Sequence, residues 1–172
     1  LQLTHHFKTV FLGDITLGVQ SGLTLQNLPL SKLYVGTANM RQSDELLERW
    51  GVIADRGSFE TMRFNEFYSD KYLQLMLRQD LKSLLFRREK FAPHLELVAR
   101  ALWGNFDAPN LHQNVSFSVP DKGYYEAGIE LNKLLKINFS GLGLGFYQRI
   151  GPYAFDEFKD NFAIKLTSKF TL

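Results

Sequence analysis

Apolar and polar side chains alternate almost without error along the last twelve residues, from Asn161 to Leu172. The apolar side chains of this stretch share one face of the predicted strand: Phe162, Ile164, Leu166, Phe170 and Leu172. A period of two is typical of a strand with one apolar and one polar face. Because chain ends usually fray, so regular a strand at the end of the sequence predicts that it closes a sheet. Closed sheets are the β-structures that outer membranes contain.

Five further stretches carry a similar alternation, at residues 5–22, 62–81, 94–106, 124–131 and 135–150. The first predicts one long strand, His5 to Gly22, with a kink at Gly13. Two short strands hinged at Gly13 and Asp14 are the alternative. In the last stretch the apolar parity changes near Ser140 and Gly141, which predicts a β-bulge. The pattern therefore predicts six long strands.

The predicted connections differ in length. Long connections cover residues 23–61, 107–123 and 151–160, and short ones cover residues 85–93 and 132–134. Inside the longest connection, Ser43 favours the start and Gly51 the end of a short helix from Asp44 to Trp50. Long loops at one rim and short turns at the other are typical of outer-membrane barrels, whose long loops are extracellular.

The predicted fold class is all-β, an antiparallel transmembrane β-barrel with a long extracellular loop at residues 23–61. Six strands are fewer than the roughly eight that the smallest single-chain bacterial barrels need. We therefore expect residues 1–172 to form the C-terminal part of an outer-membrane barrel domain, with the remainder of the barrel upstream of Leu1. The alternative is that the alternating pieces 32–35 and 115–119 are strands of the barrel as well.

The amino-acid composition is compatible with a membrane β-barrel. The 15 Phe and 7 Tyr favour strands and membrane interfaces. No run approaches the roughly 20 apolar residues of a spanning helix. The net charge of +2 is spread along the chain, so no nucleic-acid partner is expected. The absence of cysteine excludes disulfides, thiolate metal sites and cysteine nucleophiles.

Three segments carry a resemblance to a known family: FETMRFNEFYSDKY at 59–72, LWGN at 102–105, and the sequence from Gly123 to Leu172. They resemble an uncharacterised family of Bacteroidota in which a carboxypeptidase-regulatory-like domain precedes an outer-membrane barrel similar to BamA and TamA. The resemblance implies a barrel of about sixteen strands in the outer membrane of a Gram-negative bacterium. It also marks a loop-base motif as typical of the family, for which we expect a structural role: Glu66, Phe67, Ser69 and Asp70.

In barrels of the BamA and TamA type, a long loop carries an Arg-Gly pair that folds back into the lumen. Arg56 and Gly57 stand in the corresponding loop here. Their context is DRGSF, without an aliphatic residue before the pair or an aromatic residue directly after it. The resemblance thus suggests that Arg56 docks in the lumen, and a solvated loop arginine is the alternative.

Charged side chains on the predicted strands share the polar parity: Glu96, Arg100, Glu126, Glu130, Arg149, Lys165 and Lys169. A charge facing lipid costs about 2–4 kcal/mol at the midplane of the bilayer, so we expect these side chains to face the lumen. Aromatic residues at the strand ends predict two interfacial girdles. One comprises Trp103, Phe106, Tyr124, Tyr125, Tyr153 and Phe155, and the other Phe86 and Phe170.

Nothing in the sequence predicts an enzyme, a metal site or a cofactor. The run GLGLG at 141–145 lacks the spacing and the following helix of a phosphate-binding loop. His5 and His6 are adjacent, so in a strand they point to opposite faces. Glu66 and Asp70 share one face of a strand but lie too far apart to work as an acid-base pair unless the chain bulges.

The expected function is non-enzymatic, as an outer-membrane assembly or translocation factor that inserts or exports envelope proteins or lipids. Expected partners are outer-membrane lipid, lipopolysaccharide, nascent outer-membrane proteins and other envelope proteins. Two alternatives remain: a structural or passive pore-forming barrel within a larger envelope complex, and a soluble β-sandwich or lipid-binding barrel.

Overall fold

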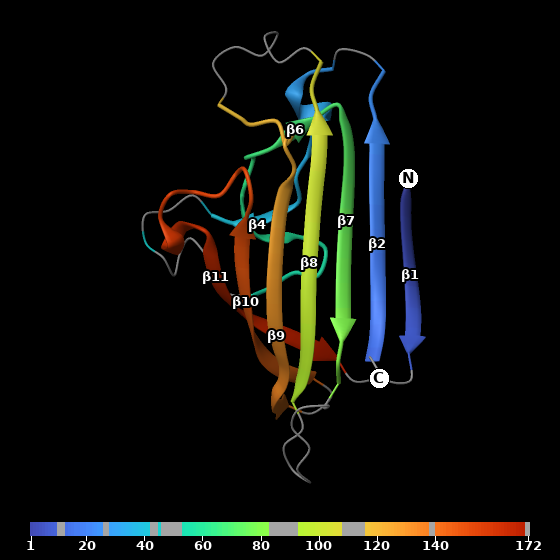
Figure 1. Ribbon diagram of the computed structural model, residues 1–172, viewed down its shortest axis with the longest axis vertical. Coiled ribbons are helices and arrows are strands. Elements are labelled where there is room, and N and C mark those ends of the chain that lie inside the picture. The colour runs from blue at the N-terminus through green and yellow to red at the C-terminus, as the bar shows by residue number, and fades with distance from the viewer. Residues whose placement is uncertain are drawn as a thin grey trace.

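The chain folds into an antiparallel seven-stranded sheet with the strand order β1-β2-β7-β8-β9-β10-β11 (Figure 1). The computed structural model describes residues 1–9, 13–25, 28–41, 45, 53–82, 93–107, 116–137 and 140–170. The strands of the sheet are β1 (Gln2–Thr9), β2 (Gly13–Leu23), β7 (Lys71–Asp80), β8 (His94–Asn105), β9 (Tyr124–Ile137), β10 (Ser140–Ile150) and β11 (Phe162–Phe170). The predicted all-β, antiparallel character is confirmed. Among the described residues, no helix is long and apolar enough to cross a membrane.

Each strand of the sheet pairs with the next strand along the chain, except that β2 pairs with β7, which follows it after a long connection. The connections that leave β2, β8 and β10 are long, covering residues 24–70, 106–123 and 151–161. Those that leave β1, β7 and β9 cover residues 10–12, 81–93 and 138–139 and lie at the other end of the strands (Figure 1). The predicted alternation of long and short connections is therefore wrong at one place, because the connection 81–93 is longer than the connection 151–161.

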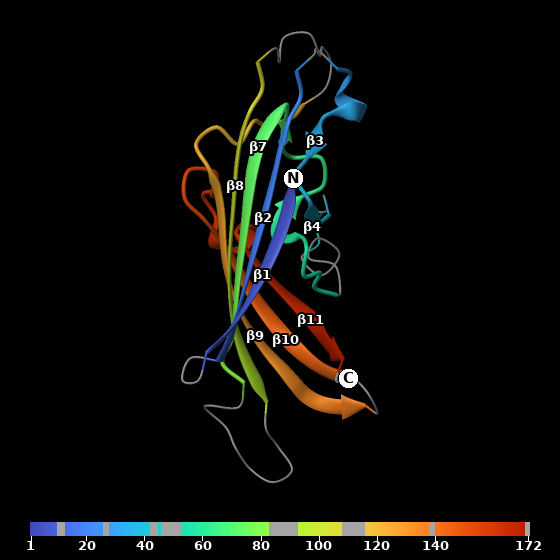
Figure 2. The same cartoon turned by 90° about the vertical axis from the view of Figure 1, so that its right-hand side faces the viewer.

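The connection between β2 and β7 folds back onto one face of the sheet (Figure 2). We call its described residues 28–41 and 53–69 the inner segment, the sheet face that they contact the inner face, and the opposite face the outer face. The inner segment holds a 3-10 turn η1 (Leu30–Lys32) and short strands β3 (Tyr34–Val35), β4 (Ala38–Met40), β5 (Phe59–Arg63) and β6 (Tyr68–Ser69). Strand β3 pairs with β6, and β4 pairs with β5.

The first predicted strand, His5 to Gly22, is wrong as a single element. It is a hairpin in which Thr9 pairs with Gly13 and Gln2 with Gln20, so the two-strand alternative describes it better. Gly13 has φ +77°, a left-handed conformation that glycine adopts at no steric cost. A side chain there would also collide with the carbonyl oxygen of Asp80. The parity of apolar residues continues across the reversal, which is why the pattern suggested one strand.

The predicted strand Met62 to Leu81 begins only at Lys71, because residues 62–69 belong to the inner segment. Asn65, with φ 59°, lies in the turn between β5 and β6, and Asn tolerates this left-handed conformation better than most residues. The predicted helix Asp44 to Trp50 lies outside the described residues, apart from Glu45. The candidate strands 32–35 and 115–119 do not join the large sheet. Tyr34–Val35 pairs within the inner segment, and Ser118 forms an isolated bridge with Phe67.

The predicted reversal at residues 132–134 is also wrong, because β9 continues to Ile137. Leu131 pairs with Leu144 and Leu135 with Leu142, so three residues of β9 lie opposite Gly143 alone. Lys133, in the middle of the three, has φ 59°. The bulge is therefore on β9 rather than near Ser140 and Gly141. The change of parity arises because residues 135–137 end one strand and β10 begins at Ser140.

An apolar core lies between the inner segment and strands β8 and β9, and it consists of Phe59, Met62, Phe67, Leu102 and Tyr124. Phe59 and Phe67 meet the Tyr124 ring edge-on, at centroid distances of 5.2 and 5.3 Å. These contacts fix the inner segment on the inner face.

Candidate functional site

The outer face of the sheet is lined by exposed aliphatic side chains, namely Leu73, Leu77, Leu97, Ile129, Leu135 and Leu166. They have the apolar parity that the alternation predicts. Cross-strand pairing aligns them in rows, because Leu97 pairs with Ile129 and Ile129 with Phe146, and paired residues point to the same side. The exposed fractions are 44% at Leu77, 49% at Ile129 and 64% at Leu135. A continuous apolar surface therefore crosses several strands of the sheet.

The inner face buries charge. Arg100 on β8 donates to Glu126 on β9 at 2.5 Å. Arg78 on β7 lies between two carboxylates, Glu96 at 2.8 Å and Glu130 at 2.7 Å. Buried charges are tolerated when each has a partner of opposite sign, and these ion pairs join three neighbouring strands.

The same set of polar contacts extends to β10 and β11 at one end of the sheet. The Tyr147 hydroxyl donates to Glu130 at 2.9 Å. Lys169 on β11 contacts Asp80 at 2.6 Å and also Glu96. All seven charged residues that we expected to face a lumen lie on the inner face, where each has a partner of opposite charge.

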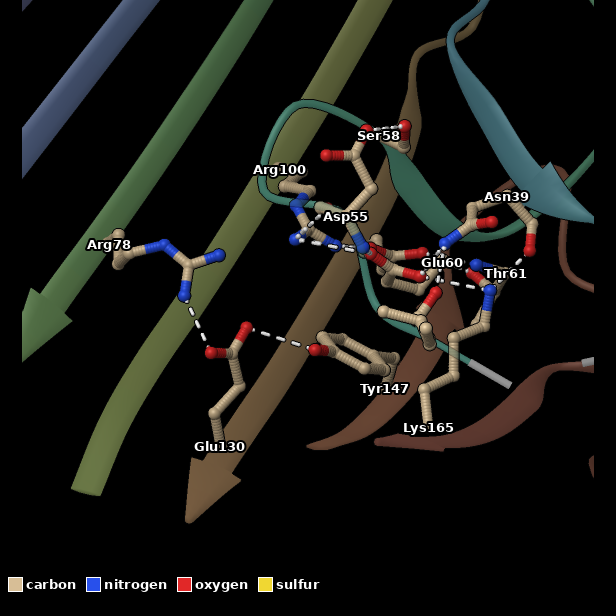
Figure 3. Close-up of polar contacts among 12 residues, drawn as sticks. Asn39, Asp55, Ser58, Glu60, Thr61, Arg78, Arg100, Glu130, Tyr147 and Lys165 are labelled. Carbon is tan, nitrogen blue, oxygen red and sulfur yellow. Dashed lines mark hydrogen bonds and ion pairs between the residues drawn. The ribbon is translucent and has the colours of Figure 1, made fainter. Parts of the chain in front are cut away.

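Glu60 of the inner segment is the centre of a second set of contacts (Figure 3). Its carboxylate accepts from Lys165 of β11 at 2.9 Å and from the Asn39 side chain at 2.7 Å. Arg100 lies 3.8 Å away. Burial raises the pKa of Glu60, and the two cations oppose that rise. Lys165 also donates to the backbone carbonyl of Asn39, so one side chain of β11 holds two strands of the inner segment.

Thr61 ties the inner segment to β9. Its backbone N–H and its hydroxyl both contact one carboxylate oxygen of Glu126 at 2.6 Å. Its hydroxyl also lies 2.8 Å from the Tyr124 hydroxyl. Sequence reasoning did not single out Glu60 or Thr61, although both lie inside the segment that carries the family resemblance.

The loop-base motif has structural contacts throughout. Arg149 of β10 binds both carboxylate oxygens of Glu66, at 2.6 and 3.2 Å. Phe67 is buried in the apolar core, where it meets the Tyr153 ring at 5.0 Å. Ser69 is buried in β6, and Asp70 accepts the backbone N–H of Asp107 at 2.8 Å. The motif therefore joins the inner segment to two long connections and to β10.

Arg56 and Gly57 lie in a turn on the inner-face side, and both are exposed. They line a pocket together with residues of β1, β2 and β7, including His6, Thr16 and Gln74. The preceding residue, Asp55, is held in place: its carbonyl accepts from Arg100 at 3.5 Å and its carboxylate accepts from Ser58. The loop thus folds onto the inner face, and docking of the Arg56 side chain in a lumen stays a prediction.

The predicted aromatic girdle at the long-loop end needs correction. Trp103 and Tyr125 lie on the outer face, with the indole N–H 3.1 Å from the phenol oxygen. Tyr124 is buried on the inner face instead, because its position in β9 has the opposite parity, and Phe106, which follows β8, is buried and packs on Phe117. Phe155 stacks on the Arg149 guanidinium at 4.2 Å, and Tyr153 packs on Phe67. Phe86 and the Phe170 side chain lie outside the described residues.

The closing strand has the predicted two faces. Ala163, Lys165 and Thr167 are buried on the inner face, whereas Leu166 is 40% exposed on the outer face. The side chains of Phe170 and Leu172 lie outside the described residues. β11 and β1 are the two edges of the sheet, and within the described residues they do not pair with each other.

One contact covers the edge of β11. Ile53 forms an isolated parallel bridge with Leu166, and the Ala54 N–H donates to the Leu166 carbonyl at 2.8 Å. Sequence reasoning missed this contact, because no local pattern links residues 113 positions apart.

The polar side chains of the inner face cross-link the strands of the sheet and the inner segment. Among the described residues, no three His, Cys, Asp or Glu side chains gather in a way that could hold a metal ion. What the arrangement offers chemically is an apolar outer surface, a charged inner surface filled by a folded-back segment, and an edge strand. Comparisons of the chain with protein-family models, curated proteins and solved structures gave no match.

Proposed function

We propose that residues 1–172 are part of an outer-membrane β-barrel that inserts or exports envelope proteins or lipids without enzymatic chemistry. The observation that carries the proposal is the reversed polarity of the sheet: aliphatic side chains are exposed on the outer face, and ion pairs are buried on the inner face. A lipid-facing surface and a polar interior are the two surfaces of a membrane barrel.

The exposed aliphatic side chains of the outer face favour contact with lipid over contact with water. Soluble monomers rarely expose apolar patches larger than a few hundred Å², whereas the outer face presents aliphatic rows across five strands, from β7 to β11. A soluble β-sandwich would cover these rows with a second sheet. The exposed residues alternate with buried Glu96, Glu126 and Glu130. The outer face can therefore contact the hydrocarbon of a bilayer, whereas the charged inner face cannot.

The inner segment favours assembly or translocation over a passive pore. A water-filled pore needs an open lumen, but the inner segment lies on the inner face and is held by Glu60, Thr61 and Glu66. An edge strand such as β11 presents backbone groups that can pair with an incoming strand. Strand pairing at an edge is the physical basis on which an assembly factor would work.

Depth-dependent quenching tests the membrane placement. Residues 1–172 contain no cysteine. Ile129→Cys, in a full-length protein from which any cysteine outside these residues has been removed, can therefore be labelled with bimane at a single position and reconstituted in vesicles. Brominated lipid should quench this label strongly. The matched control is Lys122→Cys in the connection before β9, where quenching should be weak. Equal and weak quenching at both positions would contradict the proposal.

A reconstitution assay separates assembly from passive conductance. Vesicles that contain the full-length protein should speed the insertion of an unfolded outer-membrane barrel above the rate of protein-free vesicles, and their ion conductance should stay low. A high steady conductance without faster insertion would favour the pore-forming alternative instead.

A further inference from the structure

One charged residue, Lys71, stands among the apolar residues of the outer face. It begins β7 at the end of the sheet where the long connections lie (Figure 1). It has the parity of Leu73 and Leu77, whose side chains are exposed on the outer face. Outside the bulge of β9, no other charged residue holds an outer-face position in β7 to β11 as the structure describes these strands. A charge on the lipid-facing surface of a barrel is tolerated near the bilayer interface and not at the midplane, so Lys71 marks one boundary of the apolar surface.

The Lys71 ammonium group has a partner that an incoming anion can replace. It contacts the carboxylate of Asp107, which lies just after β8, and the two side chains are 43% and 57% exposed. An ion pair between exposed groups contributes little to stability. The backbone N–H of Asp107 is held separately by Asp70 at 2.8 Å, so the chain stays in place when the carboxylate leaves Lys71. An ammonium group also has three donors, more than one carboxylate oxygen uses.

An aromatic pair lies beside Lys71 on the same face. Trp103 is the register partner of Leu73, so Lys71 and Trp103 are diagonal neighbours on adjacent strands. The Trp103 ring meets the Tyr125 ring edge-on at 5.6 Å, and the indole N–H donates to the phenol oxygen at 3.1 Å. Among the described residues, the Tyr125 hydroxyl has no acceptor for its own proton. This hydroxyl can therefore donate a hydrogen bond to a bound headgroup.

The turn that leads into β9 completes the surroundings of this pair. Gly123 has φ +83°, and a Cβ atom there would collide with the Tyr125 hydroxyl and the indole nitrogen of Trp103. Glycine thus lets the polar ends of the two rings meet at the rim. The preceding residue, Lys122, is exposed and supplies a second cation. The carboxylate of its neighbour Asp121 accepts a hydrogen bond from a tyrosine of the next long connection.

We infer that Lys71, Trp103, Lys122 and Tyr125 form a binding site for the phosphorylated sugar headgroup of lipid A, the membrane anchor of lipopolysaccharide. We call these four residues the headgroup site. The inference rests on the proposed function, in which the long connections lie outside the cell and their rim meets the outer leaflet. It adds to that function a particular lipid and the residues that bind it.

The chemistry of the headgroup site fits each part of this lipid. The ammonium groups of Lys71 and Lys122 match phosphate, to which charge-assisted hydrogen bonds are strong. Trp and Tyr side chains are favoured at the headgroup level of a bilayer, where one end of each ring is apolar and the other is wet. Below the rim, the aliphatic rows that begin at Leu73 and Leu97 offer contact to the acyl chains. A glycerophospholipid has a single phosphate and no sugar, so it uses less of the site.

Binding of fluorescent diphosphoryl lipid A to the full-length protein in detergent micelles, followed by anisotropy, tests the headgroup site. Lys71→Gln should weaken binding by at least about tenfold, because it removes a charge-assisted contact to phosphate. The matched control is Lys159→Gln. Lys159 is also an exposed lysine of a long connection that is paired with a carboxylate, that of Glu157, and its substitution should leave binding unchanged.

The acid partner of Lys71 provides a test with the opposite sign. Asp107→Asn removes the carboxylate that competes with phosphate and should strengthen binding roughly two- to fivefold. Lys71→Gln and Asp107→Asn break the same exposed ion pair, so their thermal unfolding should shift alike. A purely structural role of the ion pair would therefore change lipid binding in the same direction in both variants, and that result would overturn the inference.

Competition identifies the lipid. Unlabelled diphosphoryl lipid A should displace the probe, whereas dephosphorylated lipid A and phosphatidylglycerol should not do so at tenfold excess. Equal displacement by phosphatidylglycerol would overturn the inference by showing a general surface for anionic lipids, and so would equal affinity of Lys71→Gln and the unmodified protein. Strong quenching of the label at position 129 without lipid A binding would refute the headgroup site alone, whereas weak quenching would refute the proposed function.

Discussion

Two neighbouring residues of β8 summarise the contrast between the two faces of the sheet. Leu97 is 39% exposed on the outer face, and Glu96 is 1% exposed on the inner face, where it binds Arg78 and Lys169. In a water-soluble sheet these roles would be exchanged. The contrast shows that the strand register assigns side chains to faces, whereas the surroundings of each face decide which type of side chain is stable there.

The two faces also differ in how each residue is stabilised. An inner-face charge depends on particular partners, so its neighbours are fixed in position and kind. An outer-face aliphatic side chain depends on its medium and can be replaced by another of similar size. On the inner face, substitutions that remove one partner of an ion pair should therefore lower the free energy of unfolding most. On the outer face, substitutions that introduce a charge should do so.

The largest effect is expected on removing an inner-face cation. Arg100→Met leaves Glu126 without its ion pair and Glu60 without one of its two cations. Breaking a buried ion pair by removing one partner costs about 3–5 kcal/mol. The free energy of unfolding from urea titration in lipid or detergent measures the loss. Lys159→Met, which removes an exposed ion pair with Glu157, should change it by less than about 0.5 kcal/mol, and a similar loss in both variants would contradict the contrast.

The outer face should show the next largest effect. Ile129→Lys places a charge at an exposed position in the middle of β9. In a bilayer this should cost about 2–4 kcal/mol, whereas in water an exposed substitution changes stability by only about 0.5 kcal/mol. Leu25→Lys, at an exposed position outside the strands, is the control and should be nearly neutral. A neutral Ile129→Lys would show that the outer face is in water.

The strands with the strongest alternation could be predicted from the sequence. β8 and β11 begin within one residue of the predicted starts, because their period of two is nearly unbroken. The two strands β1 and β2 were only the alternative to a single long strand, because the parity survives the reversal at Gly13. The continuation of β9 was missed, because a bulge at residues 132–134 resembles a turn in sequence.

The site was harder to predict than the strands. The parity of Lys165 predicted its face correctly, but its partner Glu60 lies 105 residues earlier in a segment without any sustained period. The register of β11 against the inner segment decides such a pair, and the register is a property of the folded sheet. Local pattern therefore gave the orientation of side chains and could not give their partners.

Close packing on the inner face can be tested with glycine substitutions. Gly143→Ala places a methyl group against the Leu131 carbonyl oxygen and the Thr167 hydroxyl, opposite the bulge of β9. The backbone of Leu131 cannot move away easily, so the added methyl group should lower the free energy of unfolding by about 1–3 kcal/mol. Gly18→Ala on β2 is the matched control, because the nearest atom would lie at 3.7 Å, an ordinary contact. Unfolding free energies of both variants decide the question, and equal losses would show that the site opposite the bulge is not tightly packed.

The smallest effect concerns pH and Tyr34, which connects the inner segment to β7 through a hydrogen bond to Gln74 and a stacked contact with Tyr72. Burial raises the pKa of the Tyr34 phenol from 10.0 to about 12. Between these two values the unfolded chain loses the proton while the folded protein keeps it, so the stability contributed by the neutral phenol is present below pH 10 and falls as the pH rises toward 12. The loss should be on the order of 1 kcal/mol after allowance for partial exposure. Tyr34→Phe removes the titrating group, so its unfolding free energy should fall less over the same pH range. Identical losses in the two proteins would show that the contact between the inner segment and β7 does not depend on the protonated phenol.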